Sequence, residues 1–206
     1  MCAFTSGKRL ILTLALSLCA SLANAAASLG EPAPAFSSSA ADGHNISLAD
    51  YKGKTVILEW TNHDCPFVKK HYESGNIPSL QKDAAQQGIV WLQVISSAPG
   101  KQGYVDGATA QKLNASRGAA PAGIVLDPDG KIGRLYEART TPHLYIVDPA
   151  GVLIYKGGID SIRSADQADI AKADNYIRLA LADLAAARPI AHNNTQPYGC
   201  TVKYAD

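Results

Sequence analysis

Short apolar runs rich in β-branched residues alternate with segments of helical periodicity, and this alternation constrains the fold more than any other feature. Residues 55–60 and 89–95 are typical of buried strands. Between them, residues 67–87 have a helical pattern that is interrupted near Gly75 and Asn76. A further helix is expected around residues 108–115. Strands that alternate with helices in this way predict an α/β fold rather than an all-helical or all-β one.

The second half of the chain continues the pattern with a short strand, a hairpin and a closing helix. Residues 124–126 are a strand, and 143–147 and 152–155 flank a four-residue turn, which is typical of a β-hairpin. Ser164 is the expected N-cap of a last helix that ends before Pro189. The expected architecture is a central mixed β-sheet flanked by helices.

The N-terminus has the pattern of an export signal. Lys8 and Arg9 precede the apolar run 10–20, and small residues follow as far as Ala25. We predict that residues 1–25 are a signal peptide cleaved near Ala25, so that the protein is exported to the periplasm or secreted. The alternatives are a buried N-terminal helix and a lipoprotein anchored at Cys19.

Composition excludes several classes of function. The 206 residues contain 19 basic and 18 acidic side chains, so no polyanion-binding surface and no nucleic-acid partner are expected. Outside the N-terminus no apolar run reaches the length of a membrane span, about 18 residues. We therefore do not expect an integral membrane protein. We expect one domain over residues 26–188, followed by a polar C-terminal tail, residues 189–206.

Two cysteines remain after removal of the signal. They are Cys65 and Cys200, and in an exported, oxidising compartment such a pair can form a disulfide. Cys65 directly follows a predicted strand and precedes Pro66, which suits the first position of a helix. A thiol at a helix N-terminus has its thiolate stabilised by unpaired N–H groups and by the helix dipole. The alternative is a buried structural cysteine.

Charged residues surround this cysteine with opposite effects. Lys69, Lys70 and His71 place positive charge in the first two turns of the helix, and Asp64 opposes it. The sign of the net pKa shift therefore stays open at this point. The same cluster, with His63, also contains groups that bind metals, which leaves copper or zinc delivery as a minor alternative.

Several segments, taken in order, carry a resemblance to a known family. They are Leu29–Phe36 (LGEPAPAF), Asp42-Gly43, the 47–54 segment (SLADYKGK), Cys65, Thr141-Pro142 and Gly157-Gly158. Together they resemble the thioredoxin superfamily and, within it, the exported redoxins of the AhpC/TSA and thioredoxin-like oxidoreductase type. The resemblance covers residues 29–187 and implies a thioredoxin-like fold.

The resemblance implies roles for individual residues. Cys65 matches the nucleophile of that family, and Glu59 matches a buried acid that exchanges protons with the sulfur. Pro142 matches a cis-proline, with Thr141 before it facing the sulfur and offering backbone to an extended substrate. The alternatives are an exposed glutamate at a sheet edge and an ordinary trans proline in a turn.

The chain departs from the family pattern in two ways. Val68 stands where thioredoxins have their second cysteine. Leu58 and Asn62 stand where peroxiredoxins have residues that bind the peroxide. No arginine stands at that family's position beside the hairpin strand, although Arg139 is near. Substrate contacts are expected from the following residues: Asn62, Pro66, Thr141 and Pro142.

Cys200 is the candidate replacement for the missing second cysteine. A thiol in a tail can reach a distant site because the entropy of loop closure grows slowly with length. We expect Cys200 to resolve Cys65 by disulfide exchange. A permanent Cys65–Cys200 disulfide and a bridge between subunits are the alternatives.

These features predict an exported thiol oxidoreductase. Its substrate is a hydroperoxide or a protein thiol or disulfide, with an unidentified reductant and without a cofactor or resident metal. The competing hypothesis is a non-catalytic thioredoxin-fold binding module, or a copper chaperone, with a structural disulfide between Cys65 and Cys200.

Overall fold

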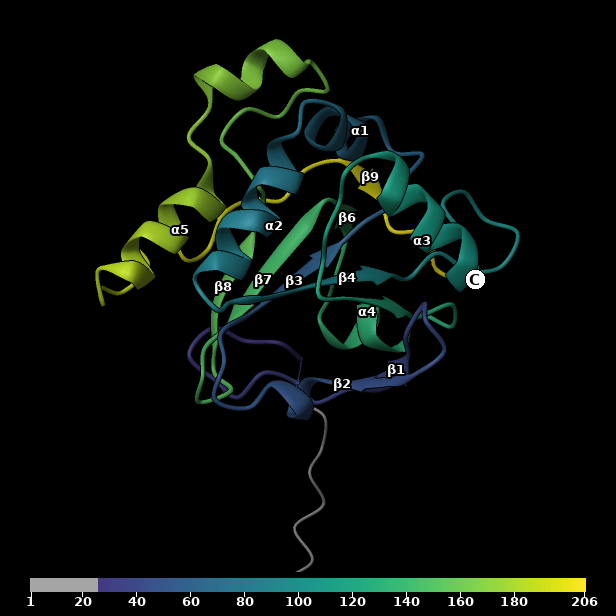
Figure 1. Ribbon diagram of the computed structural model, residues 1–206, viewed down its shortest axis with the longest axis horizontal. Coiled ribbons are helices and arrows are strands. Elements are labelled where there is room, and N and C mark those ends of the chain that lie inside the picture. The colour runs from purple at the N-terminus through teal and green to yellow at the C-terminus, as the bar shows by residue number, and fades with distance from the viewer. Residues whose placement is uncertain (1–25) are drawn as a thin grey trace, which may run out of the picture.

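The computed structural model describes residues 26–206, so the predicted export signal lies outside the described residues. A five-stranded mixed sheet forms the centre, in the order β5-β4-β3-β7-β8 (Figure 1). The first three of these strands run parallel, and β7 and β8 run antiparallel to their neighbours. The bounds are β3 (Val56–Trp60), β4 (Val90–Ile95), β5 (Gly123–Leu126), β7 (His143–Val147) and β8 (Leu153–Gly157).

The sheet is covered on both faces. One face packs against helices of the central and C-terminal regions, and the other packs against the N-terminal β-hairpin and a short helix. The covering elements are α1 (Pro66–Glu73), α2 (Asn76–Gln86), α3 (Gly107–Ser116) and α5 (Tyr176–Ala185) on the first face, and β1 (Ser37–Ser39), β2 (Asn45–Ser47) and α4 (Lys131–Leu135) on the second.

Burial on both faces explains why the strands are continuous apolar runs. All five residues of β3 are buried, and successive side chains enter opposite cores. Ile57 packs with the helices α1, α2 and α5, and Leu58 packs against the N-terminal side. Trp60 and Trp91 are both core residues.

The closing helix differs from the prediction. Instead of one helix capped by Ser164, there is a 3₁₀ helix, η2 (Gln167–Lys172), and then the separate helix α5. Asp166 accepts the capping hydrogen bond of η2, and Asn175 accepts that of α5. The two are separated because Ala173 is extended, so apolar spacing alone overestimated the length of the helix.

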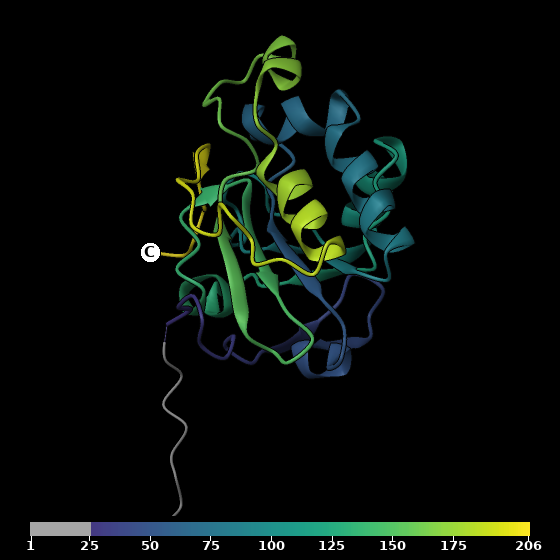
Figure 2. The same cartoon turned by 90° about the vertical axis from the view of Figure 1, so that its left-hand side faces the viewer.

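The C-terminal tail is part of the fold. Residues 140–141 form the strand β6, and Cys200–Thr201 in the tail form β9, which pairs with it antiparallel. Figure 2 shows the tail in yellow, running from the end of α5 along the sheet to the C-terminus. Its polar sequence concealed these elements, because a two-residue strand has no periodicity of its own.

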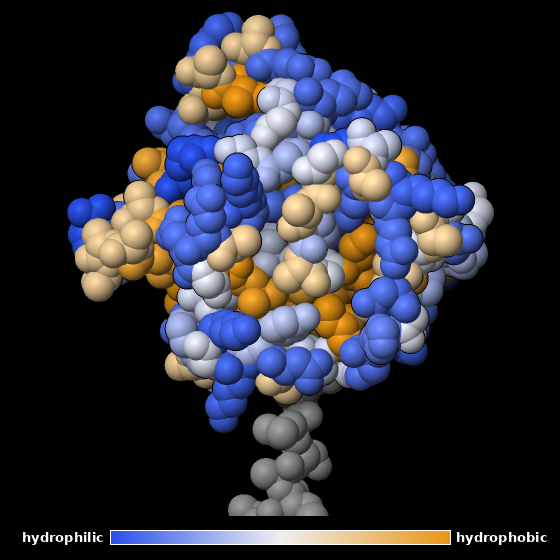
Figure 3. Space-filling view, viewed as in Figure 1, coloured by the Kyte–Doolittle hydropathy of each residue, from blue (hydrophilic) through white to orange (hydrophobic). Residues whose placement is uncertain are grey.

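The surface in the view of Figure 3 is largely hydrophilic, with apolar side chains gathered in its lower centre and at the left edge, where α5 lies. In residues 26–206, no helix combines the length and the apolar character needed to span a bilayer.

Candidate active site

The site is built where β3 ends and α1 begins. Cys65 is the N-cap of α1 and Pro66 is its first helical residue, as the sequence predicted. The Cys65 backbone carbonyl accepts from the N–H groups of Val68 and Lys69, and no side chain caps this helix. The side chain of Cys65 is 0% exposed, so its sulfur lies beneath other parts of the chain.

Asn62 holds the loop that leads to Cys65. Its Oδ1 accepts from the N–H of Asp64 at 2.9 Å, and its Nδ2 donates to the carbonyl of Gln102 at 3.3 Å. Gly103 lies so close that a Cβ there would fall 2.3 Å from this amide, at a φ of +83°. The Asn62 amide therefore has structural partners within the protein.

One residue, Thr141, contacts both cysteines. The Cys65 thiol donates to the carbonyl of Thr141 at 3.1 Å, and the Thr141–Pro142 peptide bond is cis, as expected. In the β6–β9 pair, Thr141 is the register partner of Cys200, and its hydroxyl donates to the Cys200 carbonyl at 3.4 Å. Cys65 and Cys200 belong to one apolar cluster, and neither forms a disulfide in this structure.

Gly199 permits this close pairing. A Cβ at Gly199 would lie 2.0 Å from the Thr141 carbonyl oxygen, and its φ of +133° disfavours other residues. The backbone of the tail is therefore in direct contact with the cis-proline segment. The backbone edge that the sequence assigned to an extended substrate is occupied by the chain's own tail.

The environment of Cys200 favours its neutral thiol. Burial raises the pKa of the half-buried Cys200 to about 11, and the hydrogen bond and charge interaction with Cys65 act in the same direction. Lys203 opposes them weakly. The effect of Cys65 on the pKa of Cys200 reflects how close the two side chains lie.

Glu59 lies at the centre of the sheet and is 0% exposed, so it is not an exposed residue at a sheet edge. Tyr72 donates to Oε1 of the carboxylate at 2.7 Å, and the Trp91 indole donates to Oε2 at 2.8 Å. Burial raises the pKa of Glu59, and the bonds from Tyr72 and Trp91 offset this only in part. Its hydrogen bonds run to these aromatic residues and not to Cys65.

A buried polar chain continues from Glu59 and was missed at the sequence level. Gln93 contacts the Tyr72 hydroxyl, and Asn114 Nδ2 donates to Gln93 Oε1 at 2.7 Å. Arg117 donates to Asn114 at 2.7 Å and stacks 3.6 Å above the Tyr72 ring. The polar residues Gln93 and Asn114, placed within apolar segments, were the available signal.

Lys70 and His71 do not act as free positive charges near Cys65, contrary to the expectation. Both side chains are buried, and the Lys70 ammonium lies 3.3 Å from the carboxylate of Asp160. Burial lowers the pKa of His71 to about 4, so its imidazole is neutral at neutral pH. Both residues serve a buried cluster that also contacts the tail.

Arg139 also lies apart from the cysteine pair. It lines a separate cavity of about 180 Å³ together with His143, Lys156 and the tail segment 194–197. His143 is buried, and burial lowers its pKa to about 3. Arg139 therefore does not take the place of the arginine that the peroxiredoxin pattern requires beside the cysteine.

The site brings together Cys65, Thr141, Pro142 and Cys200. Glu59 is buried and is hydrogen-bonded to Tyr72 and Trp91 instead. Two neighbouring thiols can exchange electrons by forming and breaking a disulfide. Within residues 26–206, no group of three or more His, Cys, Asp or Glu side chains is arranged to hold a metal.

Solved structures share this fold. An uncharacterized conserved protein from Geobacillus kaustophilus superposes with a TM-score of 0.73 at 24% identity, covering 86% of this chain and 93% of its own. A hypothetical protein from Sinorhizobium meliloti gives 0.72 at 20% identity, covering 86% and 95%. A thiol:disulfide interchange protein DsbE from Chlorobium tepidum gives 0.52 at 21% identity, covering 64% and 85%. The fold is thus thioredoxin-like, as the sequence predicted.

Sequence comparison identifies the family. None of the curated proteins matches the chain. The model of the AhpC/TSA family matches residues 29–156, a span that contains β3, Cys65, the cis-proline and most of the β7–β8 hairpin. The chain therefore belongs to the AhpC/TSA family.

Proposed function

We propose that this protein is an exported thiol oxidoreductase in which Cys65 attacks the oxidant and Cys200 resolves the product. The observation that carries the proposal is the position of Thr141, whose carbonyl accepts from the Cys65 thiol and which is the register partner of Cys200. This position supports Cys200 as the second thiol, which the helix lacks because Val68 stands there. Because the tail is hydrogen-bonded into the fold, the two sulfurs meet without a large search of conformations.

With a hydroperoxide, the chemistry takes two steps. The Cys65 thiolate attacks the terminal oxygen of the hydroperoxide, which breaks the O–O bond and leaves a sulfenic acid and, after protonation, an alcohol or water. Cys200 then attacks the Cys65 sulfur, forming the disulfide and releasing water. The two thiols lose two electrons and the peroxide gains them.

With a protein disulfide, the same residues carry out exchange. Cys65 attacks one sulfur and releases the other as a thiolate, and Cys200 then displaces the substrate from Cys65. Thr141 and Pro142 would offer the docking edge for such a protein, with Pro66 at the exposed start of α1 beside it. β9 occupies this edge in the structure, so a protein substrate has to displace the tail first.

Glu59 is the proposed proton acceptor and donor for this chemistry. Its raised pKa supports retention of a proton at a higher pH than an ordinary glutamate allows. A transfer to the sulfur needs at least one further group, because neither Glu59 nor its hydrogen-bond partners Tyr72 and Trp91 bond to Cys65.

The experiment compares the reduced protein with its Cys65→Ser and Cys200→Ser variants. Each is treated with hydrogen peroxide or with glutathione disulfide, and intact mass and free thiols are followed over time. The wild type is expected to lose both thiols and 2 mass units, the sign of one disulfide, by definition of that reaction. Cys200→Ser is expected to accumulate oxidised or glutathionylated Cys65, and Cys65→Ser is expected to react far more slowly.

The two oxidants separate the two substrate classes. A faster reaction with peroxide supports a peroxidase, and a faster reaction with the disulfide supports an exchange enzyme. If the wild type retains both thiols with either oxidant, the proposal is wrong and the non-catalytic binding module replaces it. Export is tested separately by the N-terminal residue of the secreted or periplasmic protein, which is expected to be Ala26.

A further inference from the structure

Tyr198 distinguishes the anchored part of the tail from the rest. Its side chain is 3% exposed, whereas most residues between 186 and 197 are exposed. It lies two residues before Cys200, so the position of its ring limits where the Cys200 sulfur can go. Phe67, in the first turn of α1, packs edge-on against this ring with centroids 5.7 Å apart.

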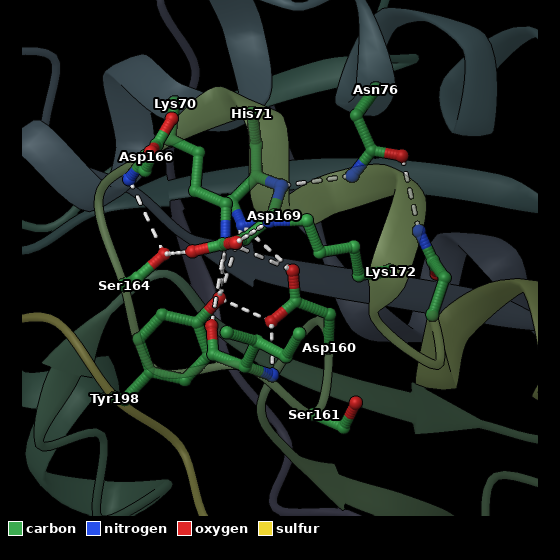
Figure 4. Close-up of polar contacts among 12 residues, drawn as sticks. Lys70, His71, Asn76, Asp160, Ser161, Ser164, Asp166, Asp169, Lys172 and Tyr198 are labelled. Carbon is green, nitrogen blue, oxygen red and sulfur yellow. Dashed lines mark hydrogen bonds and ion pairs between the residues drawn. The ribbon is translucent and has the colours of Figure 1, made fainter.

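The Tyr198 hydroxyl enters a buried cluster formed by Lys70, His71 and Asp160 (Figure 4). It donates to Asp160 Oδ1, while Lys70 Nζ binds Asp160 Oδ2 at 3.3 Å. Lys70 also lies 3.5 Å from the hydroxyl oxygen. A buried ion pair is stable only when its remaining hydrogen-bonding capacity is satisfied, and the tail residue Tyr198 helps to satisfy it.

The hydrogen-bond directions around this hydroxyl are consistent with one another. Asn76 Nδ2 lies 2.9 Å from His71 Nδ1 and can only donate, so the proton of the neutral imidazole is on Nε2. His71 Nε2 then donates to the Tyr198 oxygen at 3.3 Å. The hydroxyl thus makes one donation and accepts from Lys70 and His71, which uses its full capacity.

Two members of the cluster lie on the same helix as the nucleophile. Lys70 and His71 belong to α1, the helix whose N-cap is Cys65. A tail docked at Lys70 and His71 through Tyr198 is therefore positioned relative to Cys65 by α1 itself. Gly199 then places the next residue, Cys200, against Thr141.

We propose that Tyr198 is a positioning residue, whose docking in the Lys70–His71–Asp160 cluster holds Cys200 at Cys65 and keeps Cys65 covered. The inference rests on the proposed function, because it concerns how the resolving thiol reaches the nucleophile. It makes the polar cluster a receptor for the tail rather than a feature of stability alone. Undocking of Tyr198 is then the movement that exposes Cys65 to a substrate.

The test measures the effective concentration of one thiol at the other. The protein is equilibrated with reduced and oxidised glutathione, so that two protein thiols give a disulfide while glutathione disulfide gains two electrons and two protons. Tyr198→Phe removes only the hydroxyl, and Tyr104→Phe, at an exposed tyrosine, is the matched control. Loss of a hydrogen bond to a charged group corresponds to about a ten- to hundredfold decrease in effective concentration.

A second arm reports the cover over Cys65 without needing a disulfide. In the Cys200→Ser background, Tyr198→Phe is expected to raise the rate of Cys65 alkylation by about the same factor, because the tail opens more often. Hydrogen exchange of the Val202 amide, which donates to the Arg139 carbonyl at 3.0 Å, follows tail opening in any variant that folds.

The outcomes separate this inference from the proposed function. If Tyr198→Phe keeps the wild-type effective concentration, Cys65 alkylation rate and Val202 exchange, the positioning role is wrong. If the wild type itself forms no Cys65–Cys200 disulfide, the proposed function fails, and the alkylation arm still tests whether Tyr198 keeps Cys65 covered. A general loss of stability alone would leave the glutathione equilibrium unchanged.

Discussion

Cys200 lies opposite Thr141 in an antiparallel pair, and the carbonyl of the same Thr141 accepts the hydrogen bond from the Cys65 thiol. The backbone of the cis-proline segment therefore holds both thiols, one through a hydrogen bond from its side chain and one through strand pairing. This geometry relates the chemistry of Cys65 to the position of the tail, and four further expectations follow from it and from the buried groups around it.

Gly199→Ala is expected to loosen the tail from the cis-proline segment. The added Cβ would lie 2.0 Å from the Thr141 carbonyl, so the β6–β9 pair has to move apart. We expect a loss of at least about 1 kcal/mol in the free energy of unfolding. We also expect faster alkylation of Cys65, measured by mass spectrometry.

The matched control for that variant is Gly53→Ala. Gly53 also has a positive φ, of +84°, but nothing lies within 4 Å of an added Cβ. It therefore carries the backbone strain without the clash. Equal alkylation rates of Cys65 in the two variants would contradict the tail-cover interpretation.

The reactivity of Cys200 is expected to depend steeply on pH. With a pKa of about 11, its thiolate is rare at pH 8, and alkylation should be on the order of a hundredfold slower than for an ordinary cysteine. The rate should rise about tenfold per pH unit up to pH 11. In Cys65→Ser the pKa of Cys200 should fall, because two of its causes are removed. An unchanged pH–rate profile in that variant would refute the interaction between the two thiols.

Glu59 should impose a pH dependence on stability. Its folded-state pKa lies above 4.5, so the folded state binds the proton more tightly than the unfolded state does. Its contribution to stability is therefore present below pH 4.5 and is lost as pH rises through the folded-state pKa. Glu59→Gln is expected to remove this decline, which amounts to at most about 1.4 kcal/mol per pH unit.

Urea unfolding of the wild type and Glu59→Gln between pH 4.5 and 8 measures that slope. Comparison of slopes avoids the offset caused by altered bonds to Tyr72 and Trp91. The pH profile of disulfide formation in the same variant tests the proposed proton role. Identical profiles in the two proteins would show that Glu59 does not exchange protons with the sulfur.

His71 should act in the opposite direction on the acid side. Its pKa is lowered from 6.5 to about 4, so the unfolded state binds the proton first. Stability from this group is present above pH 6.5 and is lost as pH falls to about 4, by about 3 kcal/mol in total. His71→Gln is expected to make the decrease between pH 6.5 and 4 shallower, as measured by urea unfolding.

A residual slope is expected in that variant, because His143 is also buried and its pKa is lowered to about 3. His44, which is exposed, provides the matched control, since His44→Gln should keep the wild-type slope. If His71→Gln retains the full acid loss, the neutral buried state of His71 is wrong.

Local patterns were sufficient wherever an element is stabilised by its own apolar side chains. The strand β7 was predicted with its observed bounds, and β3 and β4 were predicted to within one residue, because burial on both faces requires continuous apolar runs. The helix α3 was also predicted to within one residue. The placement of Cys65 as the N-cap before Pro66 was likewise readable, because the helix start depends on adjacent residues.

Elements that depend on distant partners could not be read in this way. The strands β6 and β9 are two residues long and exist only because they pair with each other. The break between η2 and α5 depends on Asp166 and Asn175 as caps, which the apolar spacing of the segment does not reveal. Buried polar positions such as Lys70 and His71 resembled an exposed helix face in the sequence.

The amino-acid sequence by itself determined the α/β architecture, the family resemblance and the position of Cys65 at a helix start, since these follow from local periodicity and neighbouring residues. Only the tertiary structure decided that Cys200 meets Thr141, that Tyr198 docks in the cluster with Asp160, and that the Cys65 side chain is buried. The physical reason is that these contacts join residues far apart in the chain, and their free energy arises only when burial and hydrogen bonding act together in the folded state.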